Sequence, residues 1–219
     1  MSVHKSLEVH IEQAGRSLYT LVFNPDQYFR SYASSPSFHS PVTILSSALI
    51  AVALPLVVNS LYAQRTLGGD IGTFVSVTSL YNVFTIPIST AALLVVKAGI
   101  IYLLARGFGG CGTFRDTIKA VAIGYFPLIV SGLVLAVLTR QAYVSIGMAQ
   151  IQTPTEMAAA LKATPYRPLS TWVRVLSFLW QGHLWTFALR HIHDISLRQS
   201  VLVCFPAVVA TVLLSVPGL

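Results

Sequence analysis

Charged residues are scarce in this sequence. Asp, Glu, Lys and Arg make up 10% of its 219 residues, whereas soluble domains carry roughly 25%. A soluble fold of this size has too large a surface to cover with so few charges. The scarcity therefore excludes an ordinary soluble domain and favours lipid as the solvent, in keeping with a hydrophobic content of 54%.

Cysteine is also sparse, because Cys111 and Cys204 are the only two in the chain. One falls in a short polar loop and the other in an apolar run, so no disulfide framework is expected. The first 40 residues also lack the apolar core of a signal peptide, so we expect the N-terminus to stay as made. The net charge of +7 comes from cations that stand singly between apolar segments. We therefore expect basic loops facing an anionic membrane surface and no nucleic-acid partner.

Long uncharged runs are what the sequence has in abundance. Each is close to the roughly 20 apolar residues that a membrane-spanning helix needs, and internal prolines are tolerated in such helices. The runs predict an all-α membrane protein in which residues 41–219 form a five-helix bundle. The predicted spans are residues 41–63, 80–105, 120–139, 168–189 and 199–219.

The second apolar run is too long for one straight span. Residues 71–105 are interrupted only by Lys97, and as a helix they would measure about 52 Å against a hydrocarbon core of about 30 Å. We place the span at 80–105 and expect residues 71–79 to form an interfacial lead-in or a short re-entrant piece. The longest polar connection, residues 140–167, is expected to hold a short helix near 155–162.

Residues 1–40 form a separate N-terminal segment with an amphipathic pattern. At 100° per residue, seven apolar side chains fall within an arc of about 100°, and the charged side chains lie on the opposite side. The seven are Val3, Leu7, Ile11, Ala14, Leu18, Leu21 and Val22, and the charged ones are Lys5, Glu8, Glu12 and Arg16. Asn24 and Pro25 end this helix and can begin another, as N-cap and first residue. We expect the amphipathic helix to lie flat on the bilayer. Packing against its own protein is the alternative.

The distribution of cations predicts the orientation. Five spans place the termini on opposite sides, and the positive-inside rule assigns the side richer in Lys and Arg to the cytoplasm. The N-terminal side is the richer one, so we expect a multi-pass protein of the cell membrane with a cytoplasmic N-terminus and the C-terminus outside. Its cations are Lys5, Arg16, Arg30, Arg106, Arg115, Lys119, Arg190 and Arg198, against Arg65, Arg140, Lys162 and Arg167 on the other side.

Two short motifs resemble chemical sites without the context that such sites need. The glycines of residues 107–112 have a GxGxxG spacing, but they follow a predicted membrane helix instead of a strand. A tight cytoplasmic turn is the better interpretation. His191 and His193 stand two apart, so on a helix they diverge by about 200° and suit a metal poorly. We expect no catalytic residue, no cofactor and no metal site, because no triad can be assembled from so few acids.

Polar side chains inside the predicted spans are more informative. Lys97 and Arg174 would each cost roughly 2.5–3.5 kcal/mol at mid-bilayer, less if they snorkel. Gln181 lies seven residues after Arg174, so both share a helix face, and His183 points the other way. Either these groups form a polar seam or ion path, or they snorkel and make interhelical hydrogen bonds. No acid lies within a predicted span, which weakens a proton-coupled carrier.

Several local motifs recur along the chain in a recognisable order. They are the Asn-Pro-Asp-Gln-Tyr-Phe of residues 24–29, the Gly-Cys-Gly-Thr-Phe of residues 110–114, the Lys-Ala of residues 119–120, the Gly-Tyr-Phe-Pro of residues 124–127, and Trp185 before a short basic turn. This pattern resembles the Yip-domain family, the Ypt/Rab-interacting membrane proteins, and most of all its short prokaryotic members. The resemblance covers roughly residues 20–215. It implies a five-helix bundle with a cytoplasmic N-terminus, and in eukaryotic members roles in vesicle trafficking and membrane shaping. Their longer N-terminal region with an Asp-Leu-Tyr-type segment is absent here, so small-GTPase binding is not carried over.

Together these features favour a non-enzymatic membrane scaffold or adaptor, acting in membrane organisation or trafficking. Its expected partners are the lipid bilayer and a membrane protein or further copies of the chain. The cations expected to contact lipid or a partner are Arg106, Arg115, Lys119, Arg190 and Arg198. The alternative is a small channel or transporter component, with Lys97, Arg174 and Gln181 as its polar seam.

Overall fold

The computed structural model of this chain describes residues 12, 15–34, 39–66, 69–146 and 153–215. These residues form helices joined by turns and contain no strand, so the all-α prediction is confirmed. Besides a helical stretch at residues 15–23, the helices are α2 Pro25–Ser34, α3 His39–Thr66, α4 Gly69–Gly107, α5 Phe114–Ile123, α6 Phe126–Ser145, α7 Pro154–Ala163, α8 Tyr166–His193 and α9 Leu197–Ser215.

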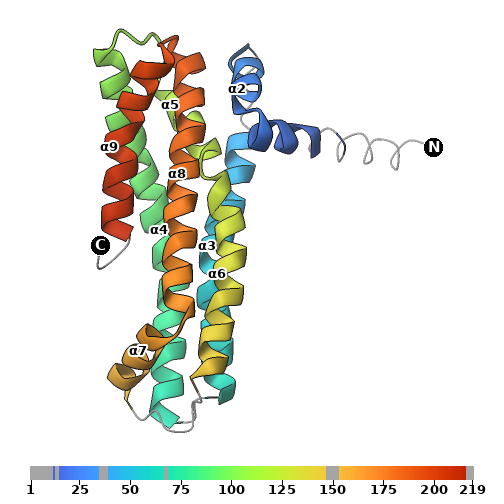
Figure 1. Cartoon of the computed structure of the whole chain (residues 1–219), viewed down its shortest axis with the longest axis vertical. Helices are drawn as coiled ribbons and strands as arrows, with labels where there is room; N and C mark the ends of the chain where they lie inside the picture. Colours follow the sequence, from blue (N-terminus) through green and yellow to red (C-terminus); the bar gives the residue numbers. More distant parts are fainter. Residues whose placement is uncertain (1–11, 13–14, 35–38, 67–68, 147–152, 216–219) are drawn as a thin grey trace, which may run out of the picture.

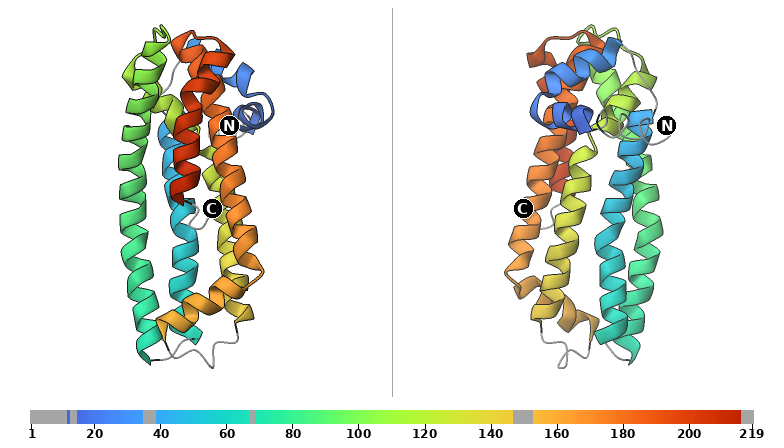
Figure 2. Two further views of the ribbon diagram at one scale, coloured as in Figure 1. Left: turned by 60° about the vertical axis from the view of Figure 1, so that its left-hand side comes forward. Right: turned by 90° about the vertical axis from the view of Figure 1, so that its right-hand side faces the viewer.

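Five long helices pack into a ring. α3 packs against α4 and α6, α6 against α8, α8 against α9, and α9 against α4. The long helices run along the vertical axis in Figure 1, with α2 at one end of the bundle and α7 at the other. We call these the α2 end and the α7 end. Figure 2 shows that the helix before α2 lies across the bundle instead of along it.

The outer surface of the bundle is apolar. On α4, for example, Phe84, Ile88 and Leu103 are 68–70% exposed. Within the part of the chain that the structure describes, three stretches are long and apolar enough to cross a membrane: Pro41–Tyr62, Gly72–Gly107 and Phe114–Ser145. Large exposed apolar surfaces are costly in water and ordinary in lipid, so this is a membrane protein with several membrane-spanning helices.

The helices α8 and α9 do not meet the same test of length and composition. α8 is 28 residues long, but Arg174, Gln181 and His183 lower its hydropathy. The apolar part of α9, Leu197–Leu213, is shorter than a typical span.

The second predicted span is one continuous helix. α4 has 39 residues and a length of about 58 Å at 1.5 Å per residue. Residues 71–79 thus continue the helix, and no separate re-entrant piece interrupts it. The helix is longer than the hydrocarbon core, so its excess must project beyond it.

The third predicted span, residues 120–139, is divided into two helices at Gly124 and Tyr125. The Tyr125 N–H bonds to the Ala122 carbonyl at 3.1 Å, which leaves the Val121 carbonyl without its usual partner. Trp185 Nε1 donates to that carbonyl at 3.1 Å. A Cβ on Gly124 would overlap the Trp185 ring, so glycine is what lets the indole reach the break. Pro127 then stands in the first turn of α6, where proline is tolerated.

The predicted short helix in the long connection is confirmed as α7. Thr153 accepts the Glu156 N–H at 3.2 Å, and Glu156 accepts the Thr153 N–H at 3.3 Å. This reciprocal capping box satisfies two backbone donors that the helix leaves free. Lys162 stands in the last turn, where it complements the helix dipole.

The amphipathic helix predicted for residues 3–22 falls largely outside the described residues. Its described part is helical over residues 15–23. Leu21 is fully buried in a cluster with Phe29, Ile44 and Leu184. Leu18, Tyr19 and Phe23 are 43%, 66% and 71% exposed.

Candidate functional sites at the α2 end and in the centre of the bundle

The start of α2 depends on the Asn24-Pro25 sequence. Asn24 Oδ1 accepts the Gln27 N–H at 3.3 Å, as expected for an N-cap. One turn later, Phe29 is fully buried against residues of α5 and α8. This burial holds α2 against the bundle and directs the first-turn residue Asp26 towards the end of α8.

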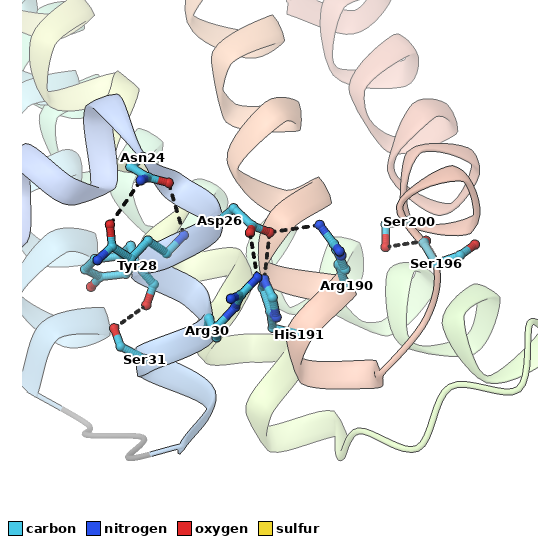
Figure 3. Close-up of polar contacts among 10 residues, drawn as sticks. Asn24, Asp26, Tyr28, Arg30, Ser31, Arg190, His191, Ser196 and Ser200 are labelled. Atoms are coloured by element: carbon cyan, nitrogen blue, oxygen red, sulfur yellow. Dashed lines mark hydrogen bonds and ion pairs between the residues drawn. The ribbon is translucent and has the colours of Figure 1, made fainter.

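Asp26 connects α2 to α8 through a cluster of charges (Figure 3). Its Oδ1 accepts a hydrogen bond from Arg190 at 3.0 Å and lies 2.8 Å from His191 Nε2. Its Oδ2 accepts from Arg30, one turn along α2, at 3.2 Å. A carboxylate can only accept, so His191 must donate through Nε2. We call these four residues the Asp26 cluster.

The Asp26 cluster is partly shielded from solvent. The exposed fraction is 29% for the Asp26 side chain and 14% for that of His191. The hydrogen bond from His191 lowers the pKa of Asp26 below its ordinary value of 3.8. Burial opposes this shift, and the charges of His191, Arg190 and Arg30 reinforce it. The carboxylate is thus ionised at neutral pH and stabilises the docked position of α2.

A glycine-rich turn closes the α2 end between α4 and α5. Gly109 has φ +83°, a conformation that side chains disfavour. The Gly109 N–H bonds to the Arg106 carbonyl at 3.0 Å and the Gly110 N–H to the Ala105 carbonyl at 2.9 Å. This is the Schellman arrangement that ends helices. The GxGxxG spacing therefore serves a tight turn, as its position after a helix indicates.

The same turn wraps around the buried ring of His193. A Cβ on Gly110 or Gly112 would stand 3.0 Å from ring atoms of His193, and the Cys111 N–H bonds to the His193 carbonyl at 3.0 Å. His193 Nε2 lies 2.8 Å from the Thr117 hydroxyl, which itself donates to the Thr113 carbonyl at 2.9 Å. With its own proton used there, that hydroxyl accepts from Nε2–H, which places a proton on Nε2 of His193.

The environment of His193 keeps the imidazole neutral. Its Nδ1 is buried and lacks a hydrogen-bond partner among the described residues. Burial lowers the pKa of His193 below its ordinary value of 6.5, and the charge of Arg106 lowers it further, while Asp116 opposes the shift. His191 and His193 thus face different neighbours, in keeping with their divergence on a helix. Among the described residues, no group of three or more acids, histidines and cysteines is placed to hold a metal.

The cations predicted to contact lipid or a partner all lie at the α2 end, but they differ in exposure and in their described contacts. Arg106 donates to the Gly110 carbonyl at 3.0 Å, and Arg190 belongs to the Asp26 cluster. Lys119 is 8% exposed at its side chain and pairs with Asp116 at 3.0 Å. Arg115 and Arg198 are exposed.

The sequence did not single out Asp26 and His191 as a pair. They are 165 residues apart, and no periodicity relates positions on separate elements. One signal was available: the chain has seven acids, and Asp26 stands in a first helical turn beside a bundle end rich in cations. A rare acid in that place is expected to find a basic partner.

Three of the polar residues predicted inside the spans, Lys97, Arg174 and Gln181, line one cavity of about 270 Å³. Lys97 comes from α4, and Arg174 and Gln181 come from α8. Helices α3, α6 and α9 also contribute, so the cavity lies inside the ring of five long helices. Its polar lining includes Thr90, Tyr125, Ser131 and Thr211, and its apolar lining includes Val52, Leu56, Leu93, Leu128, Leu135 and Phe178.

The donors in this cavity have few partners. The Lys97 ammonium lies 5.8 Å from the centre of the Tyr125 ring and 5.9 Å from that of Trp185, within cation–π range. Gln181 is 1% exposed, and its Nε2 has no hydrogen-bond partner among the described residues. His183 is exposed on the opposite face of α8.

The comparison with known families agrees with the family resemblance that the local motifs indicate. The Yip1 domain matches residues 19–217, nearly the whole chain. The chain belongs to the Yip1 domain family. Among curated proteins and among solved structures, no match was found.

Family membership fits the helical fold and the membrane character of this protein. The matched Yip1 domain begins within the helix that precedes α2 and includes both the Asp26 cluster and the central cavity. The family is not known for enzymes.

Proposed function

We propose that this Yip1 domain protein is a non-enzymatic membrane scaffold or adaptor in membrane organisation or trafficking. The observation that carries the proposal is the exposed aromatic pair Tyr19 and Phe23, whose ring centres lie 4.8 Å apart. The pair precedes α2, which the Asp26 cluster holds against the bundle. Aromatic side chains on a fixed support are typical of docking surfaces.

Charge supports the same surface. Arg115 and Arg198 are exposed at the α2 end, and cations combined with aromatic side chains suit either an anionic membrane surface or an acidic partner. The partners we propose are the bilayer and a membrane protein or a second copy of the chain. Three further cations contribute by positioning elements of this end. Arg106 positions the turn, Lys119 positions α5, and Arg190 positions α2.

The proposed topology has five spans, with the N-terminus and the α2 end in the cytoplasm and the C-terminus outside. The excess of cations on the N-terminal side supports it. Cys111 is exposed at the α2 end and Cys204 is buried, so an impermeant maleimide can report the side of Cys111. Intact cells should leave it unlabelled, whereas Ala163→Cys, placed in α7 in a Cys111→Ala chain, should react. Labelling with the opposite pattern would overturn the orientation.

The adaptor function is tested by purifying the tagged protein from its native membrane in mild detergent. A stoichiometric partner should co-purify with the wild type and be lost in Tyr19→Ser/Phe23→Ser. The control is Val144→Ser, which changes an apolar side chain that is 51% exposed in α6. Retention of the partner by the double variant, or its equal loss from the control, contradicts the proposal.

A channel or transporter component is the second candidate, because five helices surround a cavity that contains Lys97, Arg174 and Gln181. Purified protein in vesicles should then pass a solute, and Arg174→Leu should abolish the flux. Absence of flux from wild-type vesicles for every ion and solute tested would remove this candidate.

A further inference from the structure

The central cavity combines positive charge with an absence of negative charge. Two of its lining side chains, Lys97 and Arg174, are cations, and none of the described residues that line it is acidic. The nearest compensation described for Lys97 is the faces of Tyr125 and Trp185, which attract a cation without neutralising it. Uncompensated cations in a low-dielectric interior are costly, so the cavity is electrostatically suited to an anion.

The hydrogen-bonding groups of the cavity point to the same ligand. The hydroxyl of Ser131 donates to the Leu128 carbonyl at 3.3 Å, and that of Thr211 to the Ala207 carbonyl at 2.7 Å. Their protons are thus used within their own helices. The groups left to donate include Lys97, Arg174 and the buried Gln181 Nε2, which lacks a partner in the described structure. Three such donors around one space match a group rich in acceptors, such as a phosphate or a carboxylate.

The size and walls of the cavity favour a ligand larger than a simple ion. A volume of about 270 Å³ equals that of about nine waters at about 30 Å³ each. Much of the lining is apolar, including Leu56, Leu93 and Phe178. A hydrated inorganic anion would leave these walls poorly matched, whereas a headgroup with the first part of a hydrocarbon chain would contact both kinds of wall.

The position of Arg174 indicates how such a molecule would enter. Gln181 is 1% exposed, whereas Arg174, two turns nearer the α7 end, is exposed. The cavity therefore opens on the side of Arg174. That residue lies eight positions, or about 12 Å, from the start of α8 at Tyr166. The opposite face of α8 exposes Leu176 and Leu179, as expected for a helix among lipid chains.

We propose that the cavity is a binding site for an anionic headgroup, a phosphate or a carboxylate, carried by a membrane amphiphile. Arg174 at the mouth and Lys97 deeper in the bundle pair with the headgroup, and Gln181 donates a hydrogen bond to it. The apolar wall contacts the chain next to the headgroup. Since lipid tails are as apolar as these walls, affinity comes from the charges and hydrogen bonds. This inference does not depend on the adaptor function, and it gives the channel candidate a substrate class.

Native mass spectrometry of the delipidated full chain in a non-ionic detergent tests the site. Dioleoyl phosphatidic acid and oleate are the charged amphiphiles, dioleoyl phosphatidylcholine is the uncharged counterpart, and inorganic phosphate and acetate are the free anions. We expect one charged amphiphile to bind per chain and phosphatidylcholine to bind much more weakly. Saturable binding of the free anions as tight as that of the amphiphiles would assign the charge site to soluble anions and overturn the amphiphile.

Variants separate the cavity from the basic surface. Arg174→Leu and Lys97→Met should each weaken binding about tenfold or more, because each removes a charge-assisted hydrogen bond. Arg174→Lys should retain most of it. The control is Arg167→Leu, which removes an exposed cation from the same helix outside the cavity, and it should bind like the wild type.

Folding of each variant is checked by helix content and by its melting temperature in detergent. Equal affinity in the wild type, Arg174→Leu and Lys97→Met would overturn the proposal, as would the absence of saturable binding by any charged probe. Either result would leave partner docking at Tyr19 and Phe23 unaffected, so the two proposals fail separately.

Discussion

The α2 end and the centre of the bundle differ in whether their polar side chains have partners. At the α2 end, Asp26 joins α2 to α8 through two side chains, Arg190 and His191, and glycines close tightly around His193. In the centre, Lys97 and Arg174 share a cavity whose described lining has no acid, and the buried Nε2 of Gln181 has no hydrogen-bond partner among the described residues. Paired groups stabilise the fold, whereas unpaired buried donors cost stability unless a ligand satisfies them. The contrast is between an end whose buried polar groups hold helices together and a centre whose donors fit the proposed ligand.

The largest expected effect on stability comes from adding a side chain to the glycine turn that encloses His193 at the α2 end. In Gly112→Ala, the new Cβ would stand 2.7 Å from the Ile192 carbonyl oxygen and 3.0 Å from the His193 ring. Neither the backbone nor the enclosed ring can move freely, so we expect a loss of about 2–3 kcal/mol in stability. Thermal unfolding in detergent, followed by circular dichroism, measures it.

Gly107→Ala is the matched control, because a Cβ there meets no atom within 4 Å. It should be neutral or slightly stabilising, since alanine favours helices. Equal melting temperatures for Gly112→Ala and Gly107→Ala would show that the turn does not enclose His193 tightly.

Next in size is the loss of the carboxylate that joins α2 to α8. Asp26→Ala should cost about 1–2 kcal/mol, because Arg190 and His191 lose a partner in a half-buried place. Faster hydrogen exchange in α2, with unchanged exchange in α6, is the expected readout. Glu12→Ala serves as the control: it breaks the Glu12–Arg16 pair, in which the side chains are 65% and 79% exposed. Such pairs contribute about 0–0.5 kcal/mol, so an equal effect of both variants would remove the special role of Asp26.

Two glutamines provide the sharpest form of the contrast, because the same substitution should have opposite signs. Gln199 at the α2 end accepts from the Ser196 N–H at 2.9 Å and from the Ser196 hydroxyl at 2.8 Å. Gln199→Leu should therefore cost about 1 kcal/mol, whereas Gln181→Leu should stabilise the delipidated protein by about 0.5–1 kcal/mol. Melting temperatures in lipid-free detergent decide it. Destabilisation by Gln181→Leu would mean that its amide is satisfied in the free protein.

The smallest expected effect is a pH dependence at the α2 end. The pKa of His193, which lies beyond the proposed spans, is lowered in the folded state. The unfolded chain therefore binds more protons as pH falls below about 6.5. Stability contributed by the neutral ring is fully present above that pH and is lost as pH falls towards the folded-state pKa. Asp26 acts separately, because its pKa lies below 3.8.

Melting temperatures measured between about pH 7.5 and about pH 5 should thus decline in the wild type. His193→Gln, which cannot be protonated, should melt lower throughout but with a flatter profile. An unchanged slope in this variant would assign the pH dependence to other groups.

Much of the fold was predictable from local sequence. Apolar runs predicted the long helices, and Thr153 with Glu156 marks the start of α7 by a capping box. Asn24 with Pro25 marks the start of α2 in the same local way. These signals work because capping and helix propensity depend on residues a few positions apart.

Other features had no local signal. The helix break at Gly124 depends on Trp185, whose indole enters from α8 and takes the Val121 carbonyl as its partner. Similarly, the alignment of Lys97 with Arg174 depends on the order of helices around the ring, which hydropathy does not encode. The length of α4 also had no local signal. The helix continues through residues 71–79 and is longer than a span of average length.

By itself, the sequence determined that this protein is helical, that it lies in lipid, and which residues are the rare polar ones within its apolar segments. Composition and periodicity suffice for this, because the transfer of side chains into lipid is nearly additive along a chain. The tertiary structure alone decided which rare groups meet. Asp26 reaches Arg190 and His191, while Lys97 and Arg174 line a cavity whose described lining contains no acid. Pairing depends on distance in space between separate helices, and that distance exists only once the ring has closed.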